Sequence, residues 1–251
     1  MLNHPTIEKL KTLKLTGMHK AFCEQSRANE LHALSFEERL GLLIDREITE
    51  RANRALTARL RHAKLKQQAS VEDIDTRHPR ALDKALLASL LNPRWISAHR
   101  NVLITGPTGV GKTFIGCALA HMACREGFSA LYVRLPRLLP ELALGKGDGR
   151  YARLFRALAK ANVLLLDDWA LAPLTPEARH DLLELIDERH ERGATIITSQ
   201  LPVAHWHEWV NDPTLADAML DRLVHNSYQI ALKGESLRKK KAALTNSDET
   251  K

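Results

Sequence analysis

The chain has 251 residues, of which 44% are hydrophobic and 27% are charged, and this composition suits a globular protein with one sizeable core. No apolar run approaches the roughly 18 residues needed to cross a bilayer, and the N-terminus lacks a secretory signal pattern. We therefore expect a cytoplasmic protein with no membrane partner. The net charge of +7 is unevenly distributed, because residues 134–160 contain seven Lys/Arg against two Asp/Glu, whereas residues 161–230 contain four against twelve. Residues 1–100 are also basic, with 18 Lys/Arg against 12 Asp/Glu, so this polarity indicates two basic surfaces that meet a polyanion.

The first 68 residues are predicted to form a small all-helical N-terminal domain, because apolar residues recur there at three- and four-residue intervals. Within it, residues 51–66 contain six Lys/Arg and no acidic residue. That segment is compatible with DNA binding, with binding of an acidic partner, or with a plain solvated helix surface. Residues 69–100 are broken at His78–Pro79 and Asn92–Pro93, so we expect a linker and a lead-in helix there.

From residue 101 the pattern changes to alternating strands and helices. Short apolar runs, typical of parallel strands covered on both faces, occupy residues 101–105, 129–135, 162–167 and 194–199. Segments with helical periodicity separate them. We therefore predict an α/β fold over residues 101–251, a parallel sheet flanked by helices, with a helical insertion at 135–160.

Residues 106–113 read GPTGVGKT and lie between a predicted strand and a predicted helix, which is the pattern of a phosphate-binding loop. In such a loop the backbone N–H groups surround phosphate oxygens, the lysine supplies positive charge and the threonine hydroxyl ligates Mg²⁺. A glycine-rich turn with a chance lysine is the alternative, and the flanking strand and helix disfavour it. We expect ATP and Mg²⁺ as cofactors, with the nucleotide bound by Gly106, Pro107, Thr108, Gly109, Val110, Gly111, Lys112, Thr113 and Phe114.

Two acidic residues end the third predicted strand. Asp167 is placed to hold Mg²⁺ together with Thr113, and Asp168 to polarise the attacking water. Aspartate is one methylene shorter than the glutamate usual at the second position, which disfavours direct activation of the water by Asp168. Ser199 and Gln200 end the next strand, where a polar side chain can sense the γ-phosphate; a strand that simply reaches solvent is the alternative.

Two arginines follow in the C-terminal part of the chain. Arg222 lies in a predicted helix with acidic neighbours, and Arg238 lies in GESLRKKK. A guanidinium group suits phosphate oxygens, and one supplied by a neighbouring subunit would make hydrolysis depend on assembly. Taken singly, each is more often a salt-bridge partner.

Together, the stretches GPTGVGKT, VLLLDDW, ATIITSQLP, LADAMLDRL and GESLRK resemble the AAA+ ATPases of the helicase-loader and initiator clade. The resemblance covers residues 3–241 and is strongest to IstB-type transposition helpers, with DnaC-type helicase loaders as near relatives. It implies that Ser199 or Gln200 is sensor 1, that Arg222 is an arginine finger acting on a neighbouring subunit, and that Arg238 is the sensor 2 arginine. Ala170, where glycine is common, and Phe114, where histidine is frequent, depart from the pattern.

The resemblance also implies that the insertion lines a helical assembly and touches DNA. Arg150, Arg153, Arg156 and Lys160 lie broadly on one face of a predicted helix, and Lys146 precedes them. Such a stripe can neutralise phosphates without reading bases, although solvated surface charge is the alternative. We expect DNA contacts from Lys146, Arg150, Arg153 and Arg156.

These expectations describe an AAA+ ATPase that oligomerises on duplex DNA when ATP is bound and assists a transposase. The first alternative is a DnaC-type loader of a replicative helicase, which would prefer single strands or its helicase to duplex DNA. A small-molecule kinase is disfavoured, because the chain shows neither a clear acceptor site nor an arginine-rich lid.

Overall fold

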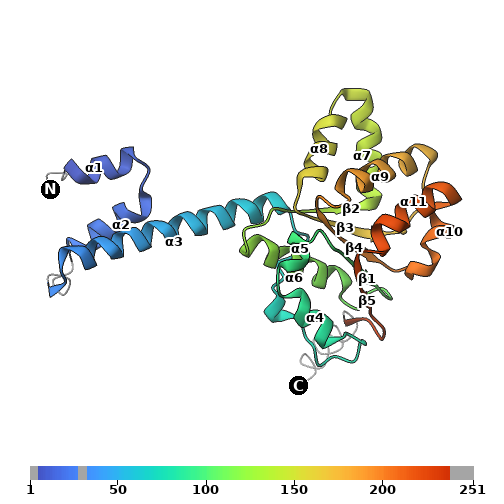
Figure 1. Cartoon of the computed structure of the whole chain (residues 1–251), viewed down its shortest axis with the longest axis horizontal. Coiled ribbons are helices and arrows are strands. Elements are labelled where there is room, and N and C mark those ends of the chain that lie inside the picture. Colours follow the sequence, from blue (N-terminus) through green and yellow to red (C-terminus); the bar gives the residue numbers. More distant parts are fainter. Residues whose placement is uncertain (1–4, 28–32, 238–251) are drawn as a thin grey trace, which may run out of the picture. The chain divides into compact units, whose positions relative to one another are not determined.

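The computed structural model describes residues 5–27 and 33–237, and Figure 1 shows the chain coloured from its N-terminus to its C-terminus. Contacts divide the chain into two compact units, Met1–Ala58 and Arg59–Lys251. The division falls inside a long helix, whereas composition places the expected domain boundary after residue 68. None of the helices within the described ranges is both long enough and apolar enough to cross a membrane.

The first unit consists of helices α1 (Pro5–Thr12) and α2 (Thr16–Gln25) and the larger part of α3 (Phe36–Ala63). Helix α2 has no side-chain cap of its own. Instead, the Glu47 carboxylate from α3 accepts hydrogen bonds from the backbone N–H groups of Gly17 and Met18 at 2.7 and 3.1 Å. A carboxylate at a helix N-terminus satisfies unpaired N–H groups and interacts favourably with the positive end of the helix dipole. This contact therefore joins α2 to α3.

The second unit is built on a sheet of five parallel strands in the order β2-β3-β4-β1-β5. The central strands β1 and β4 are buried along their whole length, as their apolar sequences predict. The strands are β1 (Asn101–Thr105), β2 (Ala130–Arg134), β3 (Val163–Trp169), β4 (Ala194–Ser199) and β5 (Ser227–Ala231).

Helices cover both faces of this sheet (Figure 1). Leu164 and Leu166 on β3 join the core formed with α7 to α11, whereas Leu165 between them meets α6 at Gly116. This alternation is expected for a strand buried on both sides.

The helices of this unit are α4 (Lys84–Leu90), α5 (Arg94–Ser97), α6 (Lys112–Arg125), α7 (Leu135–Asp148), α8 (Tyr151–Lys160), α9 (Pro176–Arg189), α10 (Trp206–Val210) and α11 (Pro213–Val224), with short 3₁₀ turns η2 (Val71–Asp73) and η3 (Val203–His205).

The α/β fold with a helical N-terminal part is therefore confirmed, with three differences in detail. The insertion at 135–160 is two helices, α7 and α8, because Gly149 adopts a left-handed conformation between them. Strand β5 was not expected, since SYQIA is short and half polar. Residues 69–100 are more than a linker, because Trp95, Ile96 and neighbouring apolar side chains pack into the second unit.

Candidate nucleotide site

The glycine-rich loop joins β1 to α6, and Lys112 is the first residue of α6. Gly111 precedes it with φ of 96°, a left-handed conformation that favours glycine. A Cβ at this position would lie 2.6 Å from Nη1 of Arg80, so any larger residue would also have to displace the Arg80 guanidinium. The loop thus presents bare backbone at a helix N-terminus, which is the arrangement that binds phosphate.

Lys112 lies over this loop. Its Nζ donates to the carbonyl oxygens of Gly106 and Pro107, at 2.7 Å each. The Thr108 hydroxyl, further along the loop, donates to Oε1 of Gln200 at 2.6 Å. The loop therefore contacts the end of β4, where a sensor residue was expected, and Gln200 rather than Ser199 makes that contact.

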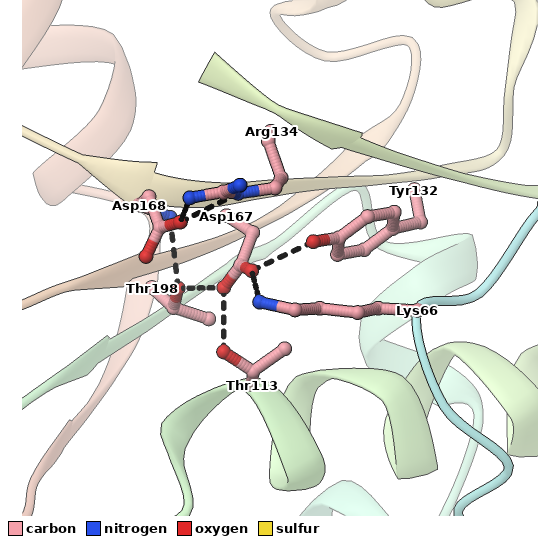
Figure 2. Close-up of polar contacts among 7 residues, drawn as sticks. All are labelled: Lys66, Thr113, Tyr132, Arg134, Asp167, Asp168 and Thr198. Atoms are coloured by element: carbon pink, nitrogen blue, oxygen red, sulfur yellow. Dashed lines mark hydrogen bonds and ion pairs between the residues drawn. The ribbon is translucent and has the colours of Figure 1, made fainter. Parts of the chain in front are cut away.

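Asp167 on β3 is fully buried and receives four donors (Figure 2). Its Oδ1 accepts from the hydroxyls of Thr113 and Thr198 at 2.7 and 2.6 Å. Its Oδ2 accepts from the Tyr132 hydroxyl at 2.8 Å and from the Lys66 ammonium at 3.2 Å. Burial acts to raise the pKa of Asp167, but these donors outweigh it and hold the pKa below its usual value, so the carboxylate is charged.

Asp168 points elsewhere because the strand is irregular at this point. Leu166 pairs with Ile197 and Trp169 with Ser199, so two residues of β3 lie opposite one residue of β4. Asp168 has φ of 61°, and its Oδ2 is held by Nε and Nη2 of Arg134 at 2.8 and 2.6 Å (Figure 2). The two acids therefore have separate partners, a hydroxyl cluster for one and a guanidinium for the other.

The residues present suit magnesium. Thr113 and Asp167 offer hard oxygen atoms at the head of α6, beside the phosphate loop. Mg²⁺ is usually held by one or two carboxylates together with substrate phosphates, not by an all-protein cage. Within residues 5–27 and 33–237 no group of three or more His, Cys, Asp or Glu side chains could hold a metal alone. The site therefore fits a metal that arrives with a nucleotide.

Arg80, in the segment 69–100 before β1, holds the phosphate loop in place through a hydrogen bond to it. Its side chain is only 2% exposed, and its guanidinium donates to the carbonyl oxygens of Val110 and Asp75 at 3.0 and 2.8 Å. The Arg80 carbonyl in turn accepts from the N–H of Lys233 at 2.9 Å. One residue thus connects the phosphate loop to the segments before β1 and after β5.

Replacing Arg80 with alanine should lower both stability and nucleotide affinity, because the buried Val110 carbonyl loses its donor at a cost of about 1–3 kcal/mol and the contact with the Asp75 carbonyl is lost as well. Thermal unfolding and titration with a fluorescent ATP analogue would measure the two effects. Arg77→Ala, an exposed arginine of the same segment, is the matched control. If both variants behave alike, Arg80 does not brace the loop.

The other expected site residues lie as follows. Ser199 is buried and its hydroxyl donates to the Trp169 carbonyl at 2.9 Å. Phe114 is half-buried in the first turn of α6. Arg222 on α11 forms an ion pair with Asp187 of α9 and donates to the Ala218 carbonyl at 2.7 Å. Arg238 lies outside the described residues.

The basic residues of the insertion divide into two groups. Lys146 pairs with the buried Asp181 at 2.6 Å, and Arg150 pairs with Asp148 at 2.6 Å. Arg153, Arg156 and Lys160 are exposed on α8, and no salt bridge involves them in the part of the chain that the structure describes. At about 100° per residue these three side chains fall within an arc of about 60°. The opposite face of α8 packs through Leu154, Phe155 and Leu158.

Residues of the site that the sequence did not reveal are Lys66, Arg80, Tyr132, Arg134 and Thr198. A signal existed for two of them, because the carboxyl ends of parallel strands meet at one edge of a sheet. Arg134 ends β2 and pairs in register with Asp167, and Thr198 lies one residue before the end of β4.

A phosphate loop between β1 and α6, with a buried aspartate at the end of β3, which β4 separates from β1, is the arrangement of P-loop proteins. The sheet and its flanking helices have the AAA+ fold expected from the sequence, and the solved structures of DnaI and DnaA share this fold. The chain belongs to the family of IstB-like ATP-binding proteins, which matches residues 8–245.

Individual proteins agree with this assignment. A relative from Sinorhizobium fredii, named as an insertion sequence ATP-binding protein, is 56% identical over 239 residues, which are 95% of this chain and 98% of the relative. Among solved structures, DnaI matches with a TM-score of 0.57 and 21% identity over 66% of this chain and 91% of its own. The DnaC helicase loader matches with a TM-score of 0.52 and 17% identity over 66% and 97%. Both likenesses concern the fold.

Proposed function

We propose that this protein is a cytoplasmic AAA+ ATPase that oligomerises on duplex DNA when ATP is bound and thereby assists a transposase. Membership of the IstB-like family supports the ATP-binding part. The name of the Sinorhizobium fredii relative, which ties that protein to an insertion sequence, supports the link with transposition. The exposed basic face of α8 is the observation that carries DNA binding, because Arg153, Arg156 and Lys160 form no salt bridge with any acidic residue that the structure describes.

In this proposal the phosphate loop binds the ATP phosphates, and Lys112 supplies a positive charge to them. Thr113 and Asp167 are the residues that would hold Mg²⁺, whose chemistry when bound is to neutralise charge on the β- and γ-phosphates. Asp168 orients and polarises the attacking water once Arg134 no longer holds its carboxylate. Gln200 lies against Thr108 of the loop and is the preferred sensor 1 residue, ahead of Ser199.

Assembly would bring arginines to the nucleotide of a neighbouring subunit. Arg222 remains the candidate finger, and Arg238 remains the candidate sensor 2 residue. For Arg222 this role requires release from Asp187, since the two side chains are paired within one chain. ATP binding would then favour association, and hydrolysis would reverse it.

The proposal predicts that ATP, and not ADP, drives association of the protein on double-stranded DNA. Sedimentation velocity of the full chain, with and without a duplex and with each nucleotide, measures this. A hydrolysis-resistant ATP analogue should give the largest particles, and duplexes of unrelated sequence should behave alike. A preference for single strands would instead favour a helicase loader, which is what the structurally similar DnaC is named. Association that ignores the nucleotide would contradict the proposal.

A further inference from the structure

Lys66 reaches the nucleotide site from a segment unrelated to the phosphate loop. It lies three residues after the end of α3, and its Nζ is 3.2 Å from Oδ2 of Asp167 (Figure 2). The Lys66 side chain is 38% exposed, whereas Asp167 is completely buried. A partly solvated ammonium group is therefore in contact with the carboxylate that the proposed function assigns to magnesium.

The backbone around Lys66 passes beside α6, the helix that begins with Lys112. Burial raises the pKa of the Cys117 thiol, one turn of α6 beyond Thr113, and the nearby backbone N–H groups of Gln67 and Lys66 act to lower it. At the other end of the segment, Nε of Arg59 donates to the carbonyl of Cys124 at 2.9 Å. The chain is thus held to α6 at Arg59 and passes close to α6 at Lys66, while the Lys66 side chain retains access to solvent.

The present hydrogen-bond donors occupy all the acceptor positions of the Asp167 carboxylate. Its two oxygens offer about four acceptor positions, and it receives four donors. A metal ion or a metal-bound water on this carboxylate must displace one donor. Of the two donors on Oδ2, Tyr132 is a shorter and neutral contact at 2.8 Å, whereas Lys66 is longer and cationic. Two cations on one buried carboxylate repel each other, and Lys66 is the one exposed residue among the four donors.

We propose that Lys66 competes with magnesium for Asp167: its ammonium group neutralises the carboxylate when no metal is bound and withdraws into solvent when metal and nucleotide arrive. The inference rests on the proposed Mg²⁺–ATP site. It gives the chain a direct connection between nucleotide binding and the segment that follows α3, because the residue that is displaced belongs to that segment. A purely structural ion pair would instead persist in the presence of the metal.

The first test is the Mg²⁺ concentration at which a fluorescent ATP analogue is half-maximally bound. Lys66→Met removes the competing charge and should lower that concentration by about tenfold, within the usual range of coupling between two bound species. Lys66→Arg keeps the charge and should retain the wild-type midpoint. Lys64→Met removes one positive charge two residues away, at an exposed side chain, and is the matched control. Equal midpoints in wild type and Lys66→Met would overturn the inference.

The second test follows the side chain itself in the wild-type chain. Acetylation by an amine-reactive reagent, read by mass spectrometry, should rise severalfold at Lys66 when Mg²⁺ and the ATP analogue are added together. It should not rise at Lys64, nor at Lys66 with the analogue in EDTA. Unchanged or reduced labelling of Lys66 would overturn the inference and leave the ATP site intact. Failure of the wild-type chain to bind the analogue at all would instead contradict the proposed function.

Discussion

Lys112→Ala should lose most of its ATP affinity, by about a hundredfold, while the fold is retained. The ammonium group lies over the phosphate loop, where Gly106 and Pro107 accept its hydrogen bonds, so it would meet phosphate oxygens in the ground state. A hydrogen bond to a charged group is worth about 1.5–3 kcal/mol, and the loop offers several to the same ligand. Titration with a fluorescent ATP analogue measures the loss, and thermal unfolding without nucleotide checks the fold.

Asp168→Asn is the natural comparison, because it changes the site without removing a phosphate contact. Its ATP affinity should stay within about twofold of wild type, whereas turnover should fall by about a hundredfold, as expected for a group that acts in the transition state. The substitution also weakens the pairing with Arg134, so Arg134→Ala separates that contact from the carboxylate's own role. If Asp168→Asn hydrolyses ATP at the wild-type rate, the water is activated by another residue.

The parts of the fold that the sequence predicts well are those where local pattern and tertiary structure agree. The strand at 101–105 and the strand at 194–199 have the predicted bounds, because apolar runs of five or six residues between turns suit a buried parallel strand. Strand β5 is not predicted, because polar residues such as Gln229 interrupt the apolar run that is typical of a buried parallel strand. Its pairing with β1 depends on tertiary structure, which the local sequence does not show. The same holds for Gly149, whose left-handed conformation splits the insertion into two helices.

The residues of the site also divide into those that the local sequence predicts and those that only the tertiary fold brings together. The loop and Asp167 follow from contiguous residues, since phosphate binding needs successive N–H groups and the carboxylate ends a strand. Lys66 and Arg80 could not be found this way, because the fold brings them to the site from 101 and 30 residues away in the chain. Ala170 has φ of 61°, a backbone conformation that favours glycine, and this conformation cannot be recognised from the sequence alone.

The second large effect concerns DNA, and it distinguishes the two groups of basic residues in the insertion. Replacing Arg153 and Arg156 together with alanine should weaken duplex binding by about tenfold or more on all sequences alike. Each lost phosphate contact should also flatten the dependence of log K on log salt by about 0.9, because fewer counterions are released. Fluorescence anisotropy with labelled duplexes over a series of salt concentrations measures both quantities. The opposite face of α8 keeps its packing through Leu158, so the fold should survive.

Arg77→Ala with Arg94→Ala provides the matched control, since both arginines are exposed outside the insertion, neither forms a salt bridge within the described residues, and the net charge changes equally. If that pair weakens binding as much as the α8 pair, total charge and not the α8 face governs affinity.

Lys146→Ala should behave differently again, because Lys146 pairs with the buried Asp181 and its loss leaves that carboxylate uncompensated. We expect Lys146→Ala to lower thermal stability more than it changes the salt slope. If the α8 pair keeps wild-type affinity and slope, its arginines are solvated surface charge, and the basic segment 51–66 becomes the leading candidate for the DNA contact.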